Sequence, residues 1–359
     1  MIGGAPMIKP ILQQWMESSM PGSLVPTFSL VMEGFTITEE NAGSLATCLA
    51  SVAAQSLSPE HAQDVVLVET GHVPLALLEQ LCRPYPWVRF HSLPPGTRYF
   101  EAKLAGAAQA SGEVLVFCDA DNVYLPGWLE SIVLPFADPT MQVVTGETSV
   151  NPTNLLGTLF ALTFFFPPFT YETELTEDLT YFGNNVAFRR SFLQQNPIPT
   201  GLPLLRGNDF VHSVRLRRQG HKVWRQPLAK AFHDPPASFH ELWLRYLARG
   251  SDRLEIWRLT HEAAGLHIRQ PGFRGVLWAS FRVVFNRIGE FIRRLVSVVR
   301  QSPRSLIYYP LAIPSSLLLL GATFAGVVIS HYRPGRLVSD YLAHYAAGHG
   351  TLDVSTTGS

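Results

Sequence analysis

Two carboxylates stand one residue apart directly after a short apolar run, and they are the residues of this chain best suited to chemistry. Asp119 and Asp121 follow the run from Val114 to Cys118. Residues i and i+2 of an extended chain point to the same side, so a bend at a strand end brings both carboxylates to one point. Paired carboxylate oxygens suit a divalent cation that also holds a diphosphate. The pattern predicts an enzyme acting on a nucleotide-activated substrate.

The residues on either side of this pair carry a family resemblance. Gly112-Glu113 precedes the apolar run, and Pro126-Gly127-Trp128 follows the carboxylates. The segment resembles the Asp-x-Asp motif of family-2 glycosyltransferases of the GT-A fold, whereas a bare Asp-x-Asp is more often a solvated turn. The resemblance continues from residue 27 to about residue 236 in the family's motif order. It implies Mg²⁺ or Mn²⁺ as cofactor, with Asp119 and Asp121 as ligands, and a UDP- or GDP-sugar as donor.

Three further positions match the donor-binding segments of that family. Phe35 and Glu69 follow the first and second expected strands, where the family holds the nucleotide base. Lys103 matches a basic residue at a helix start and is expected to face the donor phosphates. Glu33, Glu69 and Leu104 replace the family's usual proline, aspartate and asparagine, so the identity of the base stays open. Solvated loop or surface positions are the alternatives for Glu69 and Lys103.

A second set of positions matches the catalytic and acceptor segments. Gly207-Asn208-Asp209 resembles the family's Gly-Glu-Asp, which makes Asp209 the expected general base and Asn208 an acceptor contact. A helix N-terminus is expected to hold Asp209 ionised through its free N–H groups and the helix dipole; a simple N-cap is the alternative. Asn184 and Asn185 match a segment expected to contact acceptor or sugar, or else form a turn. His233, before an acidic residue and two prolines, is a candidate third metal ligand or a structural histidine.

These residues need a scaffold that gathers the ends of several strands. Apolar runs alternate with helical spacing from Pro26 to about Val150, which predicts an α/β fold with a GT-A type doubly wound, mostly parallel sheet. Ligands bind at the carboxyl ends of the strands in such sheets, and Asp119 and Asp121 stand at one of these ends. The expected strands cover residues 28–32, 65–68, 88–90 and 114–118, and the expected helices cover residues 42–55, 75–81 and 102–110.

The last third of the chain has membrane character. Val276–Val299 places apolar residues on one helix face with arginines opposite, as an interfacial helix would. Leu306–Ser330 carries no charged residue and is long enough to cross a bilayer, with a buried hairpin as the alternative. The arginines before it predict a single-pass protein of the cytoplasmic membrane with its catalytic domain on the cytoplasmic side. Leu155–Phe169 is too short and proline-broken to span, and we expect it to be buried rather than in contact with the membrane.

The whole pattern predicts an ordered set of regions and one leading function. The regions are an extension (1–25), a catalytic domain (26–236), a partly amphipathic interface region (237–304), a transmembrane helix (305–331) and a polar tail (332–359). The expected activity is metal-dependent, inverting sugar transfer to a lipid-linked or glycan acceptor near the membrane. A degenerate GT-A scaffold and, less favoured, a nucleotidyltransferase are the alternatives. Lys+Arg and Asp+Glu both number 28, so no electrostatic footprint indicates nucleic acid as a partner.

Overall fold

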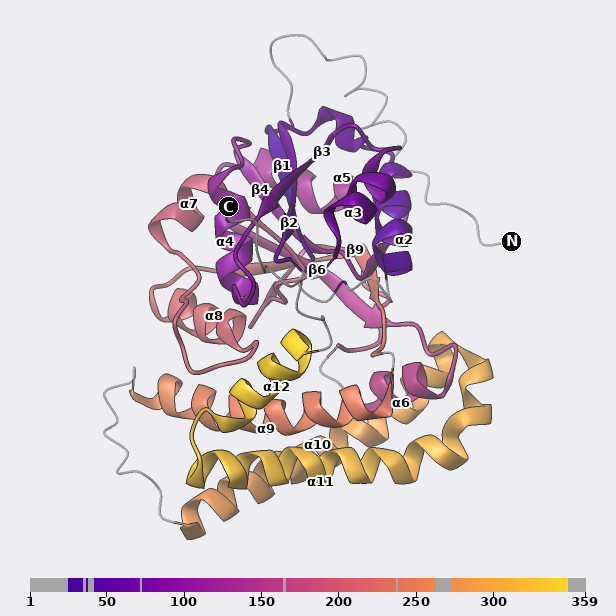
Figure 1. Cartoon of the computed structure of the whole chain (residues 1–359), viewed down its shortest axis with the longest axis vertical. Helices are drawn as coiled ribbons and strands as arrows, with labels where there is room; N and C mark the ends of the chain where they lie inside the picture. The colour runs from indigo at the N-terminus through magenta and orange to yellow at the C-terminus, as the bar shows by residue number, and fades with distance from the viewer. Residues whose placement is uncertain are drawn as a thin grey trace, which may run out of the picture.

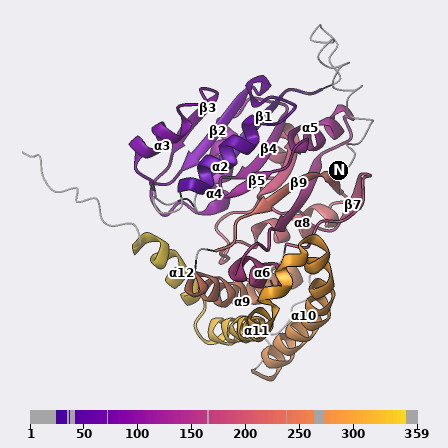
Figure 2. The same ribbon diagram turned by 90° about the vertical axis from the view of Figure 1, so that its right-hand side faces the viewer.

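A curled α/β sheet stands on a layer of long helices in this protein (Figures 1 and 2). The computed structural model describes residues 25–34, 37, 42–71, 73–163, 166–236, 238–262 and 273–347. Residues 1–24 of the expected extension and the candidate base-binding Phe35 lie outside these ranges. The described part is the α/β class that the sequence predicts, with the sheet above and the helical layer below.

The first half of the sheet is parallel. Its strands are β1 (Phe28–Glu33), β2 (Asp64–Glu69), β3 (Val88–Ser92) and β4 (Val114–Asp119), in the order β3-β2-β1-β4. Parallel neighbours need crossover connections, and the helical segments predicted from sequence supply them. These helices are α2 (Ala42–Ala53), α3 (Leu75–Cys82) and α4 (Tyr99–Ala108), with the short 3₁₀ turn η1 (Pro59–His61) before β2.

The second half of the sheet is mixed, so the parallel arrangement extends only to β4. Its strands are β5 (Asn122–Tyr124), β6 (Val143–Val150), β7 (Thr176–Asp178), β8 (Asn185–Arg189) and β9 (Val223–His233). The antiparallel β8 lies between β4 and β6, and the long β9 runs parallel to β6. The helices and turns around it are α5 (Trp128–Val133), η2 (Leu134–Ala137), α6 (Leu155–Thr163), α7 (Arg190–Gln195) and α8 (Asn208–Arg218).

The central strands are buried on both faces, because helices cover each side of the sheet. Leu30 and Met32 of β1 pack in the core that includes α2, whereas Val31 packs in the core on the side of α4. Gly106 of α4 lets that helix approach the sheet closely, since a Cβ at this position would lie 2.6 Å from side-chain atoms of Val31 and Val68. Strands β1 and β4 pair in parallel, with Glu33 opposite Asp119 at their carboxyl ends.

The helical layer consists of four helices and a 3₁₀ turn in the described part of the chain after residue 238. They are α9 (Phe239–Glu262), α10 (Phe273–Gln301), η3 (Pro303–Tyr308), α11 (Tyr309–Tyr332) and α12 (Arg336–Ala347). Within the described residues one stretch, Pro303–Tyr332, is long and apolar enough to cross a membrane; its mean hydropathy is 2.0, and 44% of its apolar 18-residue window is buried. Helix α6 packs between this layer and the sheet with Leu159, Phe160 and Leu162 buried, as predicted for that segment.

Candidate functional site

A cavity of about 510 Å³ lies between the carboxyl ends of the strands and the helices α8 and α9. The sheet side contributes Asp119, Asp121 and His233, and the α8 side contributes Asp209. Sequence positions that are far apart thus meet in one space, as the candidate roles require. The other residues that line it include Tyr99, Asn184, Arg206, Phe210, Arg245, Arg249, Asp252, Arg253, Ile256, Trp257 and Tyr341.

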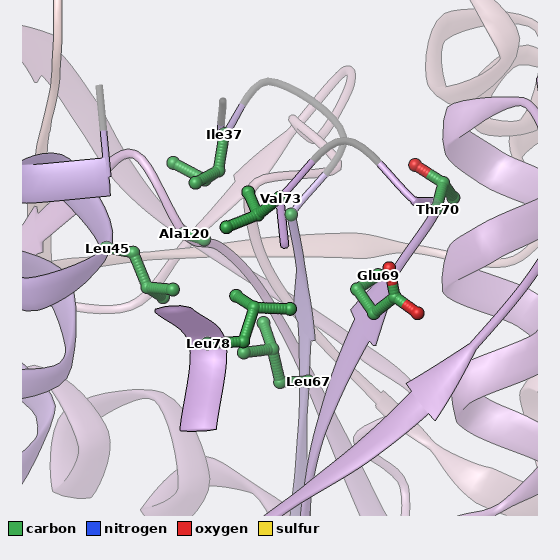
Figure 3. Close-up of a pocket in the computed structure, with 9 residues that line it drawn as sticks. Ile37, Leu45, Leu67, Glu69, Thr70, Val73, Leu78 and Ala120 are labelled. Atoms are coloured by element: carbon green, nitrogen blue, oxygen red, sulfur yellow. The ribbon is translucent and has the colours of Figure 1, made fainter. Parts of the chain in front are cut away.

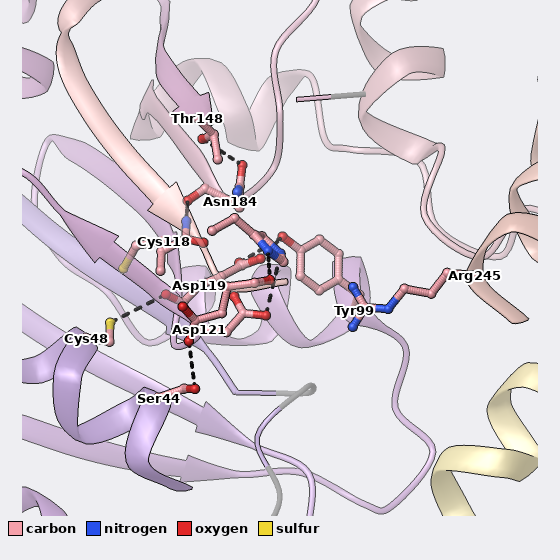
Figure 4. Close-up of polar contacts among 12 residues, drawn as sticks. Ser44, Cys48, Tyr99, Cys118, Asp119, Asp121, Thr148, Asn184 and Arg245 are labelled. Carbon is pink, nitrogen blue, oxygen red and sulfur yellow. Dashed lines mark hydrogen bonds and ion pairs between the residues drawn. The ribbon is translucent and has the colours of Figure 1, made fainter. Parts of the chain in front are cut away.

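Asp119 is held by two groups of α4. The buried Lys103 ammonium lies 2.6 Å from Asp119 Oδ1 and also donates to the Cys118 carbonyl at 3.0 Å. The Tyr99 hydroxyl donates to the same carboxylate at 2.8 Å, as Figure 4 shows. Tyr99 and Lys103 are one helical turn apart, so they present one face to the end of β4. Lys103 therefore holds Asp119 from the buried side and does not line the cavity. The sequence predicts instead that it faces the donor phosphates.

Asp121 faces the cavity beside a histidine that has a defined tautomer. His233 Nδ1 lies within hydrogen-bond distance of the Asp234 carbonyl, and a carbonyl can only accept, so Nδ1 carries the proton. In the neutral ring the opposite nitrogen, Nε2, has the lone pair, and it lies 3.5 Å from Asp121 Oδ2. A carboxylate and an Nδ1-protonated imidazole, side by side on a cavity wall, fit Mg²⁺ or Mn²⁺, and the backbone bond to Nδ1 is typical of metal-ligating histidines.

The described residues hold no group of three or more His, Cys, Asp or Glu side chains that could enclose a metal ion. The pair of Asp121 and His233 is accordingly an open site. A cation there would need oxygens from another molecule to complete its coordination, and diphosphate oxygens suit both candidate ions.

Asp209 is the second residue of α8 and is half-buried at the cavity wall. Its Oδ1 accepts from the Phe210 N–H at 2.8 Å, and its Oδ2 accepts from the Gly183 N–H at 3.2 Å. The expected N–H donors are therefore present, but burial outweighs them and raises the pKa of Asp209 to about 7. The sequence predicts that the helix N-terminus keeps this carboxylate ionised. Desolvation opposes that effect and raises the pKa instead. A carboxylate with a pKa near 7 suits a general base at neutral pH.

The three candidate amides have different places. Asn184 lines the cavity, and its buried Nδ2 has no hydrogen-bond partner among the described residues. Asn185 is fully buried and bonds Trp128 Nε1 and the carbonyls of Glu147 and Ala229, so it ties the sheet together away from the cavity. Asn208 donates to the Pro199 carbonyl at 2.7 Å and also lies outside the cavity lining. Among the predicted acceptor contacts, only Asn184 is available to a ligand.

The candidate base-binding region is a small apolar hollow at the ends of β1 and β2 (Figure 3). Glu69 lies at its edge, and Glu69 Oε2 accepts from the Gly71 N–H at 2.7 Å. Figure 3 also shows Leu67, Val73 and Leu78 around the hollow. Glu69 thus has a structural bond in its own turn, and its predicted contact with a base remains a prediction.

Sequence reasoning missed the wall that α9 supplies. Arg245, Arg249 and Arg253 are spaced four residues apart and all line the cavity, and Figure 4 shows Arg245 reaching toward Tyr99. The same helix contributes Asp252, whose carboxylate accepts the N–H groups of Leu205 and Arg206 and so fixes the loop before α8. The regular spacing of three arginines was a readable signal, but nothing in the sequence indicates that α9 folds back over the strand ends.

Comparison with protein families gives a match over the segment that carries the Asp-x-Asp motif. The family model described as Glycosyl transferase family 2 matches residues 36–196, which include α2 to α7 and the segment with Asp119 and Asp121. Residues 36–196 are a glycosyl transferase family 2 domain. This match agrees with the family that the Asp-x-Asp segment indicates. No curated protein matches the chain.

Two solved structures resemble the chain at low identity. GalNAc-T7 with UDP, GalNAc and Mn²⁺ has 18% identity and a TM-score of 0.47, covering 58% of this chain and 44% of its own. The chain therefore spans under half the length of that protein. The mannosyltransferase PcManGT from Pyrobaculum calidifontis, in complex with GDP-Man and Mn²⁺, has 14% identity and a TM-score of 0.45, covering 94% of this chain and 92% of its own.

Proposed function

We propose that this glycosyltransferase transfers a sugar, with inversion, from a nucleotide-sugar to an acceptor hydroxyl near a membrane, and that it depends on Mg²⁺ or Mn²⁺. The observation that carries this proposal is the placement of Asp121 and Asp209 in the lining of one cavity. The first offers oxygens for a cation on the diphosphate, and the second offers a base. Membrane proximity is supported by the apolar helical layer that continues from α9.

The donor would lie with its diphosphate at Asp121 and His233. A cation held there supplies positive charge to the departing diphosphate. Asp119 is already neutralised by Lys103, so its role is to fix the end of β4 and to offer its remaining hydrogen-bonding capacity to the nucleotide. Asn184 contributes a buried amide donor to a sugar or phosphate oxygen. UDP and GDP are both compatible with this wall, because Glu69 and Phe35 leave the choice of base open.

Asp209 would take the proton of the acceptor hydroxyl as that oxygen attacks the anomeric carbon. Inversion requires one such base, whereas retention through a covalent intermediate requires a carboxylate nucleophile as well. Asp252 is a poor nucleophile here, since both of its oxygens accept backbone N–H groups. A single available carboxylate on this wall therefore favours inversion.

The direct test is stabilisation of the detergent-solubilised full chain by UDP and by GDP, each with and without Mn²⁺. We expect one nucleotide to raise the melting temperature only when Mn²⁺ is present, and a panel of sugars on that nucleotide then finds the donor. Absence of any shift with either nucleotide would favour the alternative of a degenerate scaffold. Analysis of the anomeric configuration of the product separates inversion from retention.

The pH dependence of turnover tests the role of Asp209. Only the ionised carboxylate can accept a proton, and its pKa is raised to about 7. We therefore expect kcat/KM to fall about tenfold per pH unit below pH 7, whereas a carboxylate of ordinary pKa would keep its activity to about pH 5. The measurement is a pH profile of initial rates with saturating Mn²⁺. Asp209→Asn should leave a small residual rate without this inflection; an unchanged inflection would exclude Asp209 as its source.

The arginines of α9 favour an acceptor that carries an anionic group, such as a lipid phosphate. Arg253 is suitable to test, because its side chain lines the cavity on the wall that faces Asp121 and Asp209. We expect Arg253→Gln to raise the acceptor KM roughly tenfold or more with little change in the donor KM, since a lost charge-assisted bond costs about 1.5–3 kcal/mol. Initial rates with each substrate varied in turn measure both constants. Equal effects on the two constants would argue against an acceptor role.

A further inference from the structure

Most of the large apolar side chains that are exposed in the described residues belong to α10, η3 and α11. On α10 they recur every three or four residues, so they form one stripe along the helix. This stripe is exposed rather than packed on the protein, with exposed fractions from 42% to 65%. Its members are Trp278, Phe281, Phe285, Ile288, Ile292 and Val296.

A second exposed apolar surface belongs to η3 and the first half of α11. Its side chains are 36% to 77% exposed. They are Leu306, Ile307, Leu311, Ile313, Leu317 and Leu318. The other face of α11 is small, partly polar and buried against the protein: Ala312, Ser316, Leu319, Thr323, Gly326 and Ser330. Helix α11 therefore has two different faces, and large exposed apolar side chains lie on only one of them.

The buried side of α11 is locked to α9 by contact between the two backbones. A Cβ on Gly326 would lie 2.1 Å from the Leu247 carbonyl oxygen, and a Cβ on Gly250 would lie 2.2 Å from the Thr323 carbonyl oxygen. One turn further, Leu254 packs on Val327. Only glycine permits this approach, so the two helices are fixed side by side in the second half of α11.

Helix α9 cannot enter the hydrocarbon of a bilayer together with α11. Beside Gly250 it carries Arg249, Asp252 and Arg253, and all three line the same cavity as Asp121 and Asp209. Charged side chains in the centre of a bilayer cost at least about 2.5–3.5 kcal/mol each, and this wall must meet water-soluble substrates. Since α11 touches α9 at this level, an α11 that crossed the bilayer would carry the cavity wall into it.

We propose that α11 does not cross the membrane but lies in its plane, and that α10 and α11 together form a face which enters one leaflet of a lipid bilayer. Exposed arginines accompany this face at positions 293, 300, 304 and 333. Glu290, the acidic residue of α10, is paired with Arg294 at 2.6 Å. An apolar stripe with basic residues around it matches a leaflet that contains anionic lipids.

The consequence for the enzyme is a one-sided attachment, in place of the single span predicted from hydropathy alone. Figures 1 and 2 show α10 and α11 on the side of α9 that faces away from the sheet. The cavity, the catalytic domain and the segment after α11 then all lie on the same side of the bilayer.

Side-specific labelling decides between the two arrangements without any measurement of activity. The three natural cysteines are buried, so a membrane-impermeant maleimide reports on a cysteine introduced at an exposed serine. Ser191→Cys lies in α7 of the catalytic domain, and Ser339→Cys lies in α12, beyond α11. In sealed membrane vesicles of known orientation we expect both to react from the same side. Reaction from opposite sides would establish a spanning α11 and overturn the proposal.

A second experiment tests the apolar face itself. The purified full chain is mixed with phosphatidylcholine vesicles that either contain or lack phosphatidylserine, and the detergent is removed. Flotation of the vesicles in a density gradient then measures the fraction of protein that is bound. We expect Phe281→Glu with Phe285→Glu to lower the bound fraction at least tenfold, and phosphatidylserine to increase binding of the unaltered chain. Leu75→Glu is the matched control, because Leu75 is 54% exposed on α3 of the catalytic domain. The unaltered chain could instead form a soluble dimer that does not bind vesicles and that dissociates in the Phe285→Glu variant. That result would assign the face to a second copy and overturn the proposal.

Discussion

Asp121→Asn should abolish metal-dependent sugar transfer while leaving the folded structure intact. Asp121 lines the cavity beside His233 Nε2, and an amide cannot replace the charge of a carboxylate toward a divalent cation. Loss of electrostatic stabilisation of a leaving diphosphate costs on the order of a thousandfold in kcat. We therefore expect both the rate and the Mn²⁺-dependent nucleotide stabilisation to disappear, whereas the melting temperature of the ligand-free protein stays within a few degrees.

The design of this experiment needs a control for the loss of one negative charge. Asp138→Asn supplies it, because Asp138 lies in an exposed turn where it accepts from Thr140 and lies outside the cavity lining. That variant should keep its rate. If Asp121→Asn retained turnover within tenfold of the unaltered chain, the cation would have to be held elsewhere and the proposed mechanism would be wrong. His233→Gln, tested beside it, should weaken Mn²⁺ binding with a smaller loss of kcat.

Local sequence was sufficient to predict the parallel half of the sheet and the position of the Asp-x-Asp segment. In this half each strand and its following helix are adjacent in sequence, and the apolar pattern determines which face is buried. The mixed half was less readable: β8 inserts between β4 and β6, and its pairing depends on residues far apart in the chain. Asn185 is an example: its side-chain oxygen accepts a hydrogen bond from the Trp128 indole, and its sequence position beside Asn184 does not predict this contact.

The residues that sequence reasoning missed belong to the layer that closes the cavity. The motif segments lie on the sheet, but Arg245, Arg249 and Arg253 come from α9, and their role depends on how that helix docks. Hydropathy predicts α11 as a spanning segment, and a window average does not separate its buried small-residue face from its exposed apolar face. The close approach of Gly250 and Gly326, on which the proposal of an in-plane α11 rests, becomes visible only when both helices are placed.

The last prediction concerns the buried ion pair that holds the end of β4. Lys103 is completely buried and lies 2.6 Å from Asp119, whose side chain is 9% exposed. The pair is largely buried, and removing one partner of a buried pair leaves an uncompensated charge, at a cost of about 3–5 kcal/mol. Lys103→Met should therefore lower the melting temperature by roughly 5–15 °C. The Tyr99 hydroxyl, which still donates to Asp119, limits the loss without replacing the charge.

A matched surface pair and a double variant separate charge from packing in this measurement. Lys222→Met breaks the pair with Glu177, in which the side chains are 57% and 52% exposed, and should cost less than about 1 kcal/mol. Lys103→Met combined with Asp119→Leu should be more stable than Lys103→Met alone, because it removes the unpaired carboxylate as well. If the double variant were instead less stable by the sum of both single losses, the two side chains would act independently. Asp119 would then be fixed by Tyr99 and the strand rather than by Lys103, and the positioning role of Lys103 would be excluded.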